Sequence, residues 1–417
     1  MTVAGPVIDE GGLIIKLAWR NIWRNLRRTL ITLSAVSFGL ASIIVFNGFT
    51  DGFHTQWIAN YVRAYTGHIQ IHGKGYRDDP DLSKAIDPAP ILSILKAMPE
   101  VEYAATRIES EGLASTAENS AGVLIKGVDL VNENNITRIS ERVIKGSYLR
   151  PGGKGVLIGH RLAKKLNADI GDKIVLMTQA ADGTLSAELF RVEGIFKIGA
   201  IDFDSSVALI TKGDSGRFTA IGDKVTEIAV LLKRPEDVIP VTDALRQRLE
   251  PGGLEVFGWQ ELMPALTEMI ELDDVFMYVI LAIVLVVVAF GILNTMLMSI
   301  MERTRELGIM MALGTKPGRI VALVLTEAFF IGALGTATGV GLGIAGNALI
   351  SIKGFDLSRW AGAMEFFAAL NPVIYPEILL RSVTWASLTI FITAILSAIY
   401  PALKASRLKP VEAIHFV

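Results

Sequence analysis

Four long apolar segments stand out against an otherwise mixed pattern of polar and apolar residues. A helix that crosses the hydrocarbon core of a bilayer needs about 20 mostly apolar residues. Each segment reaches that length, and the second contains the most apolar stretch of the chain, VILAIVLVVVAFGIL. The pattern predicts transmembrane helices over residues 29–50, 273–301, 320–350 and 382–401.

The region between the first two spans has a different pattern. Short apolar or alternating runs such as HIQIHG (68–73), DKIVLM (172–177) and EIAVLL (227–232) are typical of strands, and helical patterns lie between them. Pro and Gly mark the joints. The predicted fold class is therefore a membrane protein with four transmembrane α-helices and a large α+β domain, residues 51–272, inserted between helices 1 and 2.

The distribution of Lys and Arg predicts the orientation, because loops that stay in the cytoplasm are enriched in both. We expect residues 1–28, 302–319 and 402–417 to be cytoplasmic, and residues 51–272 and 351–381 to be extracytoplasmic. The segment 351–381 argues weakly against this orientation, since it is expected to be extracytoplasmic but also carries basic residues. We therefore expect the chain to cross the membrane several times, with both termini in the cytoplasm. The basic residues of the cytoplasmic segments are Lys16, Arg20, Arg24, Arg27, Arg28, Arg303, Arg305, Lys316, Arg319, Lys404, Arg407 and Lys409.

The N-terminal segment 1–28 is predicted to form an amphipathic helix before the first span. Apolar residues recur at helical spacing, and Trp19 and Trp23 stand beside basic residues. Trp rings and long basic side chains suit the headgroup layer of a bilayer. A solvated helix with one charged face is the alternative.

Composition supports the membrane assignment and excludes several kinds of chemistry. The chain has 417 residues, of which 51% are hydrophobic and 20% charged, and its mean hydropathy is +0.46. The net charge of −2 argues against nucleic-acid binding driven by bulk charge. No cysteine is present, which excludes disulfides and thiolate chemistry. We found no phosphate-binding loop, catalytic group or metal site, so we expect no enzymatic activity in this chain.

The segment between the second and third spans reads ERTRELGIMMALGTKPGRI (302–320). Alternating charges come first, followed by apolar residues, a glycine stop and a Lys-Pro pair that starts the next helix. A short amphipathic helix that projects from a membrane bundle suits docking of a soluble partner. A plain helical hairpin is the alternative, although exposed Met and Leu would be unusual without a partner.

This segment closely resembles the coupling segment of a superfamily of ABC-transporter permeases that includes the MacB, FtsX and lipoprotein-release (LolC/LolE-like) types. Three other stretches are similar: LAWRNIWRNLRRTLITL (17–33), the tail IYPALKASRLKPVEAIHF (399–416), and GVLIGHRLAKKLNADIGDKIVL (155–176) with VEGIFKIGAIDFDSSVALI (192–210). The order of one span, a large domain and three spans also matches. MacB-type chains carry their own ATPase and FtsX-type chains generally have a smaller external domain, which favours the lipoprotein-release type.

The resemblance implies a location in a bacterial inner membrane, a set of partners and a mode of action. Such permeases pair with a second permease copy, identical or paralogous, and with a cytoplasmic ATPase dimer that binds ATP and Mg. No cofactor is expected in this chain, and a periplasmic carrier or effector protein and membrane lipids are further expected partners. The resemblance assigns ATPase coupling to Glu302, Arg303, Arg305, Glu306, Leu307, Gly308, Met311, Leu313 and Gly314. We also expect that replacing Arg303, Arg305 or Leu307 uncouples the ATPase and leaves the fold intact.

Three functions remain open at this level. The first is extraction or release of a lipoprotein or another amphiphile from the outer leaflet of the inner membrane. The others are an FtsX-like mechanotransmitter that regulates an extracytoplasmic partner, and MacB-like efflux of small amphiphiles. Apolar residues at the outer ends of the first two spans could face a lipidated substrate or simply lipid. They are Val45, Phe46, Phe49, Phe53, Phe276, Val279 and Ile280.

The third span carries small residues at a regular interval. Gly335, Gly339 and Gly343 are four residues apart, which lets helix backbones approach closely in lipid. We expect a packing role, against a helix that the sequence does not identify. Glu327 is costly within a span, and we expect it near the cytoplasmic interface, without a proton-relay role.

Overall fold

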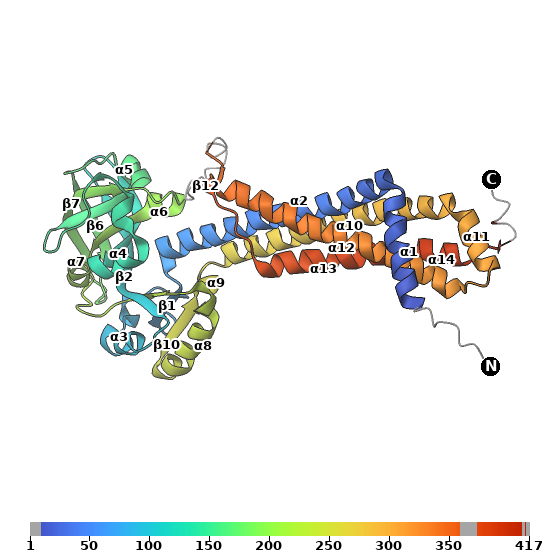
Figure 1. Ribbon diagram of the computed structural model, residues 1–417. Helices are drawn as coiled ribbons and strands as arrows, with labels where there is room; N and C mark the ends of the chain where they lie inside the picture. Colours follow the sequence, from blue (N-terminus) through green and yellow to red (C-terminus); the bar gives the residue numbers. More distant parts are fainter. Residues whose placement is uncertain (1–9, 359–372, 411–412, 414–417) are drawn as a thin grey trace. The chain divides into compact units, whose positions relative to one another are not determined.

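The computed structural model describes residues 10–358, 373–410 and 413, and the chain forms two units (Figure 1). The membrane unit comprises Met1–His54, Ile270–Phe355 and Val373–Val417, and the inserted domain comprises Thr55–Met269 with Asp356–Pro372. Within the described residues, four helices are long and apolar enough to cross a membrane. A mixed α/β domain lies between the first and second of them, so the predicted fold class is confirmed.

The predicted domain boundaries fall partly on residues 1–9, 359–372, 411–412 and 414–417, which lie outside the described residues. Elsewhere the helices begin and end at different residues from the predicted spans. The helices of the membrane unit are α1 Glu10–Arg24, α2 Leu26–Tyr61, α10 Pro264–Glu302, α11 Thr304–Ala312, α12 Pro317–Ser351, α13 Leu380–Ser397 and α14 Ile399–Ser406.

Two of the spans are much longer than their apolar segments. Helix α2 has 36 residues and α10 has 39, so at 1.5 Å per residue they are about 54 and 58 Å long. The hydrocarbon core of a bilayer is about 30 Å thick. Both helices are therefore longer than the hydrocarbon core is thick, and their ends carry polar and aromatic residues that the hydropathy pattern could not assign to a span.

The fourth span breaks into two helices at Ala398, which is fully buried. Pro401 lies three residues later, in the first turn of α14. A proline has no N–H to donate and its ring clashes with the carbonyl four residues earlier. That carbonyl belongs to Ser397, the last residue of α13, so the proline accounts for the position of the break.

The long helices pack around one apolar core, and α1 lies across the bundle rather than along it (Figure 1). Each helix contributes a stripe of small or branched residues to that core. Ile22 of α1 belongs to it, which ties α1 to the bundle. The buried residues are Ile22, Val36, Leu40, Ile43, Ile44, Val288, Ile292, Met296, Ala328, Ile331, Ala386, Ile390, Ala394 and Ala398.

The inserted domain is built on one mixed, ten-stranded sheet. Its strand order is β10-β1-β9-β2-β3-β8-β5-β7-β4, and β6 pairs with β2 and β7. Strands β3 and β8 are parallel, as are β5 and β7, and the other pairings are antiparallel. The strands are β1 Ile69–Gly73, β2 Val101–Ser115, β3 Ser120–Val128, β4 Val143–Gly146, β5 Gly155–Gly159, β6 Lys173–Gln179, β7 Leu185–Phe196, β8 Val207–Thr211, β9 Glu227–Leu232 and β10 Leu254–Gly258. Two further short strands are β11 Phe355–Asp356 and β12 Val373–Ile374.

Short helices connect and cover these strands. Several begin at an Asp whose carboxylate accepts backbone N–H groups, for example Asp87 before α3 and Asp129 before α4. The helical segments of the inserted domain are η1 Val62–Thr66, η2 Leu82–Lys84, α3 Pro88–Lys96, α4 Leu130–Thr137, η3 Ile139–Arg142, α5 His160–Leu166, α6 Ile201–Ser206, α7 Lys212–Phe218, η4 Pro235–Asp237, α8 Val238–Leu249, η5 Glu250–Gly252 and α9 Trp259–Leu262.

A buried ionic cluster joins the end of the first long helix to the sheet. The Arg107 guanidinium on β2 is fully buried and donates to both Glu133 carboxylate oxygens, at 2.7 and 2.9 Å. It also donates to Glu227 at 2.6 Å and to the Tyr65 carbonyl at 2.8 Å. Tyr65 belongs to η1, which directly follows α2. The cluster therefore ties η1 to the sheet within the inserted domain.

His68, just before β1, predicts a pH dependence of this domain. Its Nδ1 accepts the Leu232 N–H at 2.9 Å, and burial lowers the pKa of the imidazole to about 4. The unfolded chain, with a His pKa near 6.5, takes up the proton first as the pH falls. We therefore expect stability to fall between about pH 6.5 and 4, by roughly 3 kcal/mol in total.

Hydrogen exchange of the β1 and β9 amides in the full chain, corrected for the intrinsic rate at each pH, measures this effect. The His68→Gln variant keeps an acceptor but cannot titrate in this range, so its protection should lose that part of the pH dependence. An unchanged pH dependence in the variant would show that His68 does not carry it.

Candidate coupling site at the end of the membrane bundle

Helix α11 is a short helix between two long ones, and the backbone sets it apart at both ends. Arg303 leaves the helical conformation after α10, and Gly314 has a φ of +96°, a left-handed value that favours glycine. Pro317 then occupies the first turn of α12, where its missing N–H costs nothing. The Gly and Pro signals in the sequence therefore place α11 correctly.

The inner face of α11 packs into the bundle. Thr304, Leu307 and Gly308 are buried, and Leu307 is 3% exposed. Leu307 belongs to an apolar cluster that also contains Ile300, Ile320, Val324, Ala402 and Ala405. Residues of α10, α12 and α14 thus hold α11 by direct apolar contact.

The outer face of α11 is free of such contacts. Arg305 and Glu306 are exposed, and Ile309 and Leu313 are 44% and 83% exposed. Large apolar side chains exposed beside charged ones are typical of a surface that a protein partner covers. We call Arg305, Glu306, Ile309 and Leu313 the outer face of α11.

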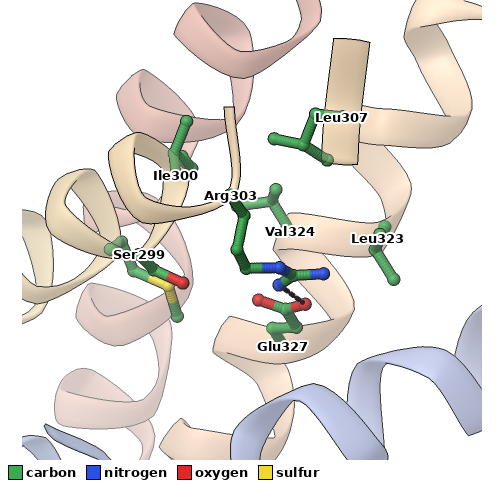
Figure 2. A pocket seen from close by; sticks show the side chains of 8 residues that line it. Ser299, Ile300, Arg303, Leu307, Leu323, Val324 and Glu327 are labelled. Atoms are coloured by element: carbon green, nitrogen blue, oxygen red, sulfur yellow. Dashed lines mark hydrogen bonds and ion pairs between the residues drawn. The ribbon is translucent and has the colours of Figure 1, made fainter. Parts of the chain in front are cut away.

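A buried polar triad lies under α11. Arg303 Nη1 lies 2.9 Å from Glu327 Oε1, and Asn21 Nδ2 donates to the same oxygen at 2.7 Å. Glu327 is 5% exposed and Asn21 9%. Figure 2 shows Arg303 and Glu327 facing each other beside a small cavity that Leu307, Leu323 and Val324 also line. One triad thus connects α1, the junction of α10 and α11, and α12.

Two more ion pairs join α1 and the start of α2 to the same region, at its surface. Arg24 donates to Glu306 at 2.9 Å, and Arg28 donates to Glu302 at 2.8 Å. Arg28 also donates to Ser299 at 2.7 Å. The exposed Arg24–Glu306 pair contributes little to stability on its own. The Arg24–Glu306 pair nevertheless links α11 to α1, and the Arg28 contacts link α2 to the end of α10.

The structure divides the predicted coupling residues into two groups. Glu302, Arg305, Glu306, Leu313 and Gly314 are exposed, and Met311 is partly buried. Their role in coupling stays a prediction.

The other group lies inside, and one expectation about it is wrong. Arg303, whose side chain is 11% exposed, Leu307 and Gly308 face the bundle. Replacing Arg303 or Leu307 would not leave the fold intact, because the change would leave Glu327 without its cation or bury a carboxylate in an apolar cluster.

The partners of Glu327 were not predicted from the sequence. A lone acid in an apolar span requires a partner, and this requirement pointed to a basic residue at the same end of the bundle. Several arginines met that condition, so the sequence could not select Arg303. Asn21 gave no signal, because an Asn among the Arg and Trp of an amphipathic helix is unremarkable.

Gly335, Gly339 and Gly343 of α12 pack against α2. The sequence predicted this packing role but did not identify the partner helix. A Cβ on Gly335 would lie 2.7 Å from Val36 Cγ1, and one on Gly343 would lie 2.7 Å from Ile44 Cβ. Ser37 Oγ donates to the Gly335 carbonyl at 3.1 Å, and Asn347 Nδ2 donates to the Ile44 carbonyl at 2.9 Å. Gly339 lies in the same row, against Leu40.

The predicted substrate-facing residues lie on α2 and α10. His54 Nε2 lies 3.0 Å from Asp273 Oδ2, which connects α2 and α10. On α10, Phe276, Val279 and Ile280 are 65%, 52% and 38% exposed. On α2, Phe46 is 44% exposed, whereas Val45, Phe49 and Phe53 are partly buried. Whether they face a substrate stays a prediction.

Two family profiles match most of the chain. The profile described as MacB-like periplasmic core domain matches residues 29–248. The profile described as FtsX-like permease C-terminal matches residues 278–410, the part that includes α11, Arg303 and Glu327.

Two individual relatives and one solved structure are also similar to this chain. The lipoprotein-releasing system transmembrane protein LolC of Neisseria meningitidis serogroup B is 22% identical over 404 residues, which cover 93% of this chain and 94% of LolC. The pyoverdine export ATP-binding/permease protein PvdT of Pseudomonas fluorescens is 27% identical over 424 residues, which cover 96% of this chain and 59% of PvdT. The periplasmic region of MacB from Actinobacillus actinomycetemcomitans matches with a TM-score of 0.35 at 12% identity, over 51% of this chain and 98% of that structure. The chain therefore belongs to the ABC-transporter permeases of the MacB/FtsX/LolC family.

Proposed function

We propose that this chain is the permease subunit of an ABC transporter and that a separate ATPase docks on the outer face of α11. The observation that carries the proposal is the two-sided packing of α11. Its inner face is fixed to α10, α12 and α14, and its outer face carries exposed apolar and charged side chains. In this proposal α11 and both termini are cytoplasmic, and the inserted domain and the 351–381 segment are extracytoplasmic.

The contacts around α11 support a role in transmitting motion. A push on the outer face would reach α12 through Leu307 and the Arg303–Glu327 ion pair, and α1 through Glu306 and Asn21. Packed elements with charged contacts move as units rather than deform continuously. Helices α2 and α10 continue without a break beyond bilayer thickness, which suits transfer of such motion out of the membrane.

The proposal places ATP and Mg in the partner ATPase dimer and requires a second permease copy. Helix α10 offers the surface for that copy or for lipid, because only 11% of its most apolar window is buried, compared with 39% for α2 and 44% for α12. That copy is either identical to this chain or a paralogue of it.

For the substrate, we propose a lipoprotein or another amphiphile, extracted from the outer leaflet of the inner membrane. The match to LolC, which extends over nearly the full length of both chains, supports this. Exposed apolar side chains at the outer ends of α2 and α10, among them Phe46 and Phe276, suit contact with acyl chains.

Export of a small amphiphile is the second candidate. It is favoured by the match to PvdT, which at 27% is more similar in sequence than LolC at 22%. The name of PvdT describes pyoverdine export and an ATP-binding part, and this chain spans 59% of its length. The two candidates share the docking role of α11 and differ only in what the outer end of the bundle accepts.

Charge and polarity changes on the outer face should release the ATPase. We expect Arg305→Glu combined with Leu313→Asp to lower co-purification of the ATPase by about tenfold or more, as for loss of interface hot spots. The matched control is Arg381→Glu with Leu380→Asp, because Leu380 is 78% exposed and Arg381 is also exposed, and both lie at the start of α13. Equal loss of ATPase in both variants would contradict the docking proposal.

Photo-crosslinking in the host cell separates the substrate candidates. A photoreactive amino acid at Phe46 or Phe276 should capture lipoprotein, and depletion of the chain should leave lipoproteins in the inner membrane. Capture of lipid alone, with normal lipoprotein sorting and altered susceptibility to small amphiphiles, would select export. Normal sorting and susceptibility with an impaired extracytoplasmic enzyme would select the regulatory function.

A further inference from the structure

Helix α1 presents three distinct faces. Ala18, Asn21 and Ile22 are buried against the bundle. Residues four apart share a face of a helix, so Ile15, Trp19 and Trp23 form one exposed stripe, at 53%, 42% and 44% exposure. Lys16, Arg20 and Arg24 form a second exposed stripe beside it, which Arg27 of α2 follows.

The basic stripe has more charge than the protein neutralises. Residues 11–50 contain Lys16, Arg20, Arg24, Arg27 and Arg28 and no Asp or Glu. Arg24 and Arg28 pair with Glu306 and Glu302. Lys16, Arg20 and Arg27 are exposed and have no ion pair among the described residues. Lys16 and Arg20 of α1 and Arg27 of α2 are thus three cations without an ion pair in the described part of the chain, and the acid that α1 contains, Glu10, lies at its first residue.

The aromatic stripe contacts the apolar part of the bundle through Phe330, which is partly buried. The Trp19 ring lies 5.2 Å from Phe330 of α12 and 5.8 Å from Trp23, both edge to face. Phe330 belongs to a membrane-spanning helix, so the tryptophans lie beside the apolar region and the basic stripe lies on their far side. Tryptophan at the boundary and basic residues towards the headgroups is the arrangement of a helix that lies in a membrane interface.

We propose that the exposed side of α1 is a binding surface for anionic phospholipid headgroups, with Lys16, Arg20 and Arg27 as the contacts and Trp19 and Trp23 as the anchors. The charge complementarity selects anionic over zwitterionic lipid. The proposal rests on the membrane assignment of the chain and not on its substrate or on the ATPase. Asn21 and Arg24 of the same helix contact Glu327 of α12 and Glu306 of α11. Helix α1 therefore carries the proposed lipid-binding surface and also contacts the coupling helix α11.

Brominated lipids test the surface directly, since bromine quenches tryptophan fluorescence at short range. The full chain is placed in phosphatidylcholine nanodiscs that contain the same small fraction of either brominated phosphatidylglycerol or brominated phosphatidylcholine. The chain has 6 tryptophans, and subtracting the signal of a Trp19→Phe/Trp23→Phe variant isolates those of α1. We expect stronger quenching by phosphatidylglycerol than by phosphatidylcholine, and salt should weaken this preference. Removing one contributing charge should lower the binding constant for phosphatidylglycerol by about fivefold.

Two variants with the same change in net charge decide the result. Lys16→Gln/Arg20→Gln/Arg27→Gln should bring the two lipids to equal quenching. Lys316→Gln/Lys404→Gln/Arg407→Gln removes exposed basic residues outside α1 and should keep the preference. Equal quenching in the unmodified chain, or equal loss in both variants, would overturn the proposal.

Discussion

Replacing Glu327 with alanine is expected to free α11 from the bundle. The change leaves the Arg303 guanidinium, 11% exposed, without its buried partner and removes the acceptor of Asn21. Removing one partner of a buried ion pair costs about 3–5 kcal/mol, because the remaining charge stays desolvated. Of the ion pairs described around α11, the Arg303–Glu327 pair is the most buried, so its loss should destabilise the packing of α11 most.

Thiol accessibility measures the release of α11 cleanly, because the chain has no cysteine of its own. Thr304 is 3% exposed, so a Thr304→Cys variant should react slowly with a water-soluble maleimide. Adding Glu327→Ala should raise the rate by on the order of a hundredfold, the factor that corresponds to about 3 kcal/mol. Glu302→Ala, which removes the more exposed Arg28–Glu302 pair, should change the rate little.

Removing both charges should largely restore protection. An Arg303→Met/Glu327→Leu variant leaves no buried ion, and apolar replacements of buried ion pairs are often neutral or stabilising. Slow labelling of Thr304→Cys/Glu327→Ala, or fast labelling of the apolar double variant, would contradict the role given to this pair.

Replacing Gly343 with leucine is expected to separate α2 from α12. A Cβ at this position would lie 2.7 Å from Ile44 Cβ, far inside van der Waals contact. The helices must move apart, which stretches the hydrogen bond from Asn347 to the Ile44 carbonyl. Overpacking of a close contact costs about 1–3 kcal/mol, and we expect a lower melting temperature in nanodiscs.

Gly341 provides a matched control on the same helix. A Cβ there meets nothing within 4 Å, so Gly341→Leu should leave the melting temperature unchanged or slightly raised, since leucine favours the helix more than glycine does. Equal shifts for both variants would show that close packing of α2 and α12 does not depend on the glycine row.

The sequence predicted the features that rest on repeated patterns. Hydropathy located the four spans, because some 20 apolar residues in a row have few other uses. Gly314 and Pro317 located the end of α11, since each restricts the backbone in one specific way. The lengths of α2 and α10 escaped prediction, because polar residues such as Asp51 and His54 continue a helix without any hydropathy signal.

The site was less predictable, because its contacts join residues far apart in the chain. Asn21 and Glu327 are 306 residues apart, and no local pattern encodes that approach. A similar limit applied to Arg303, which looked like its exposed neighbour Arg305 in sequence. Helix α10 ends at Glu302, and the Arg303 side chain that follows this end reaches Glu327.

The central claim is that the outer face of α11, and not the inner one, meets the ATPase. A photoreactive amino acid placed singly at Ile309, Leu313, Leu307 or Thr304 tests it in cells that contain the ATPase. We expect crosslinks to the ATPase from Ile309 and Leu313, and crosslinks only within the chain from Leu307 and Thr304. Crosslinks to the ATPase from the buried positions, or none from Ile309 and Leu313, would contradict it.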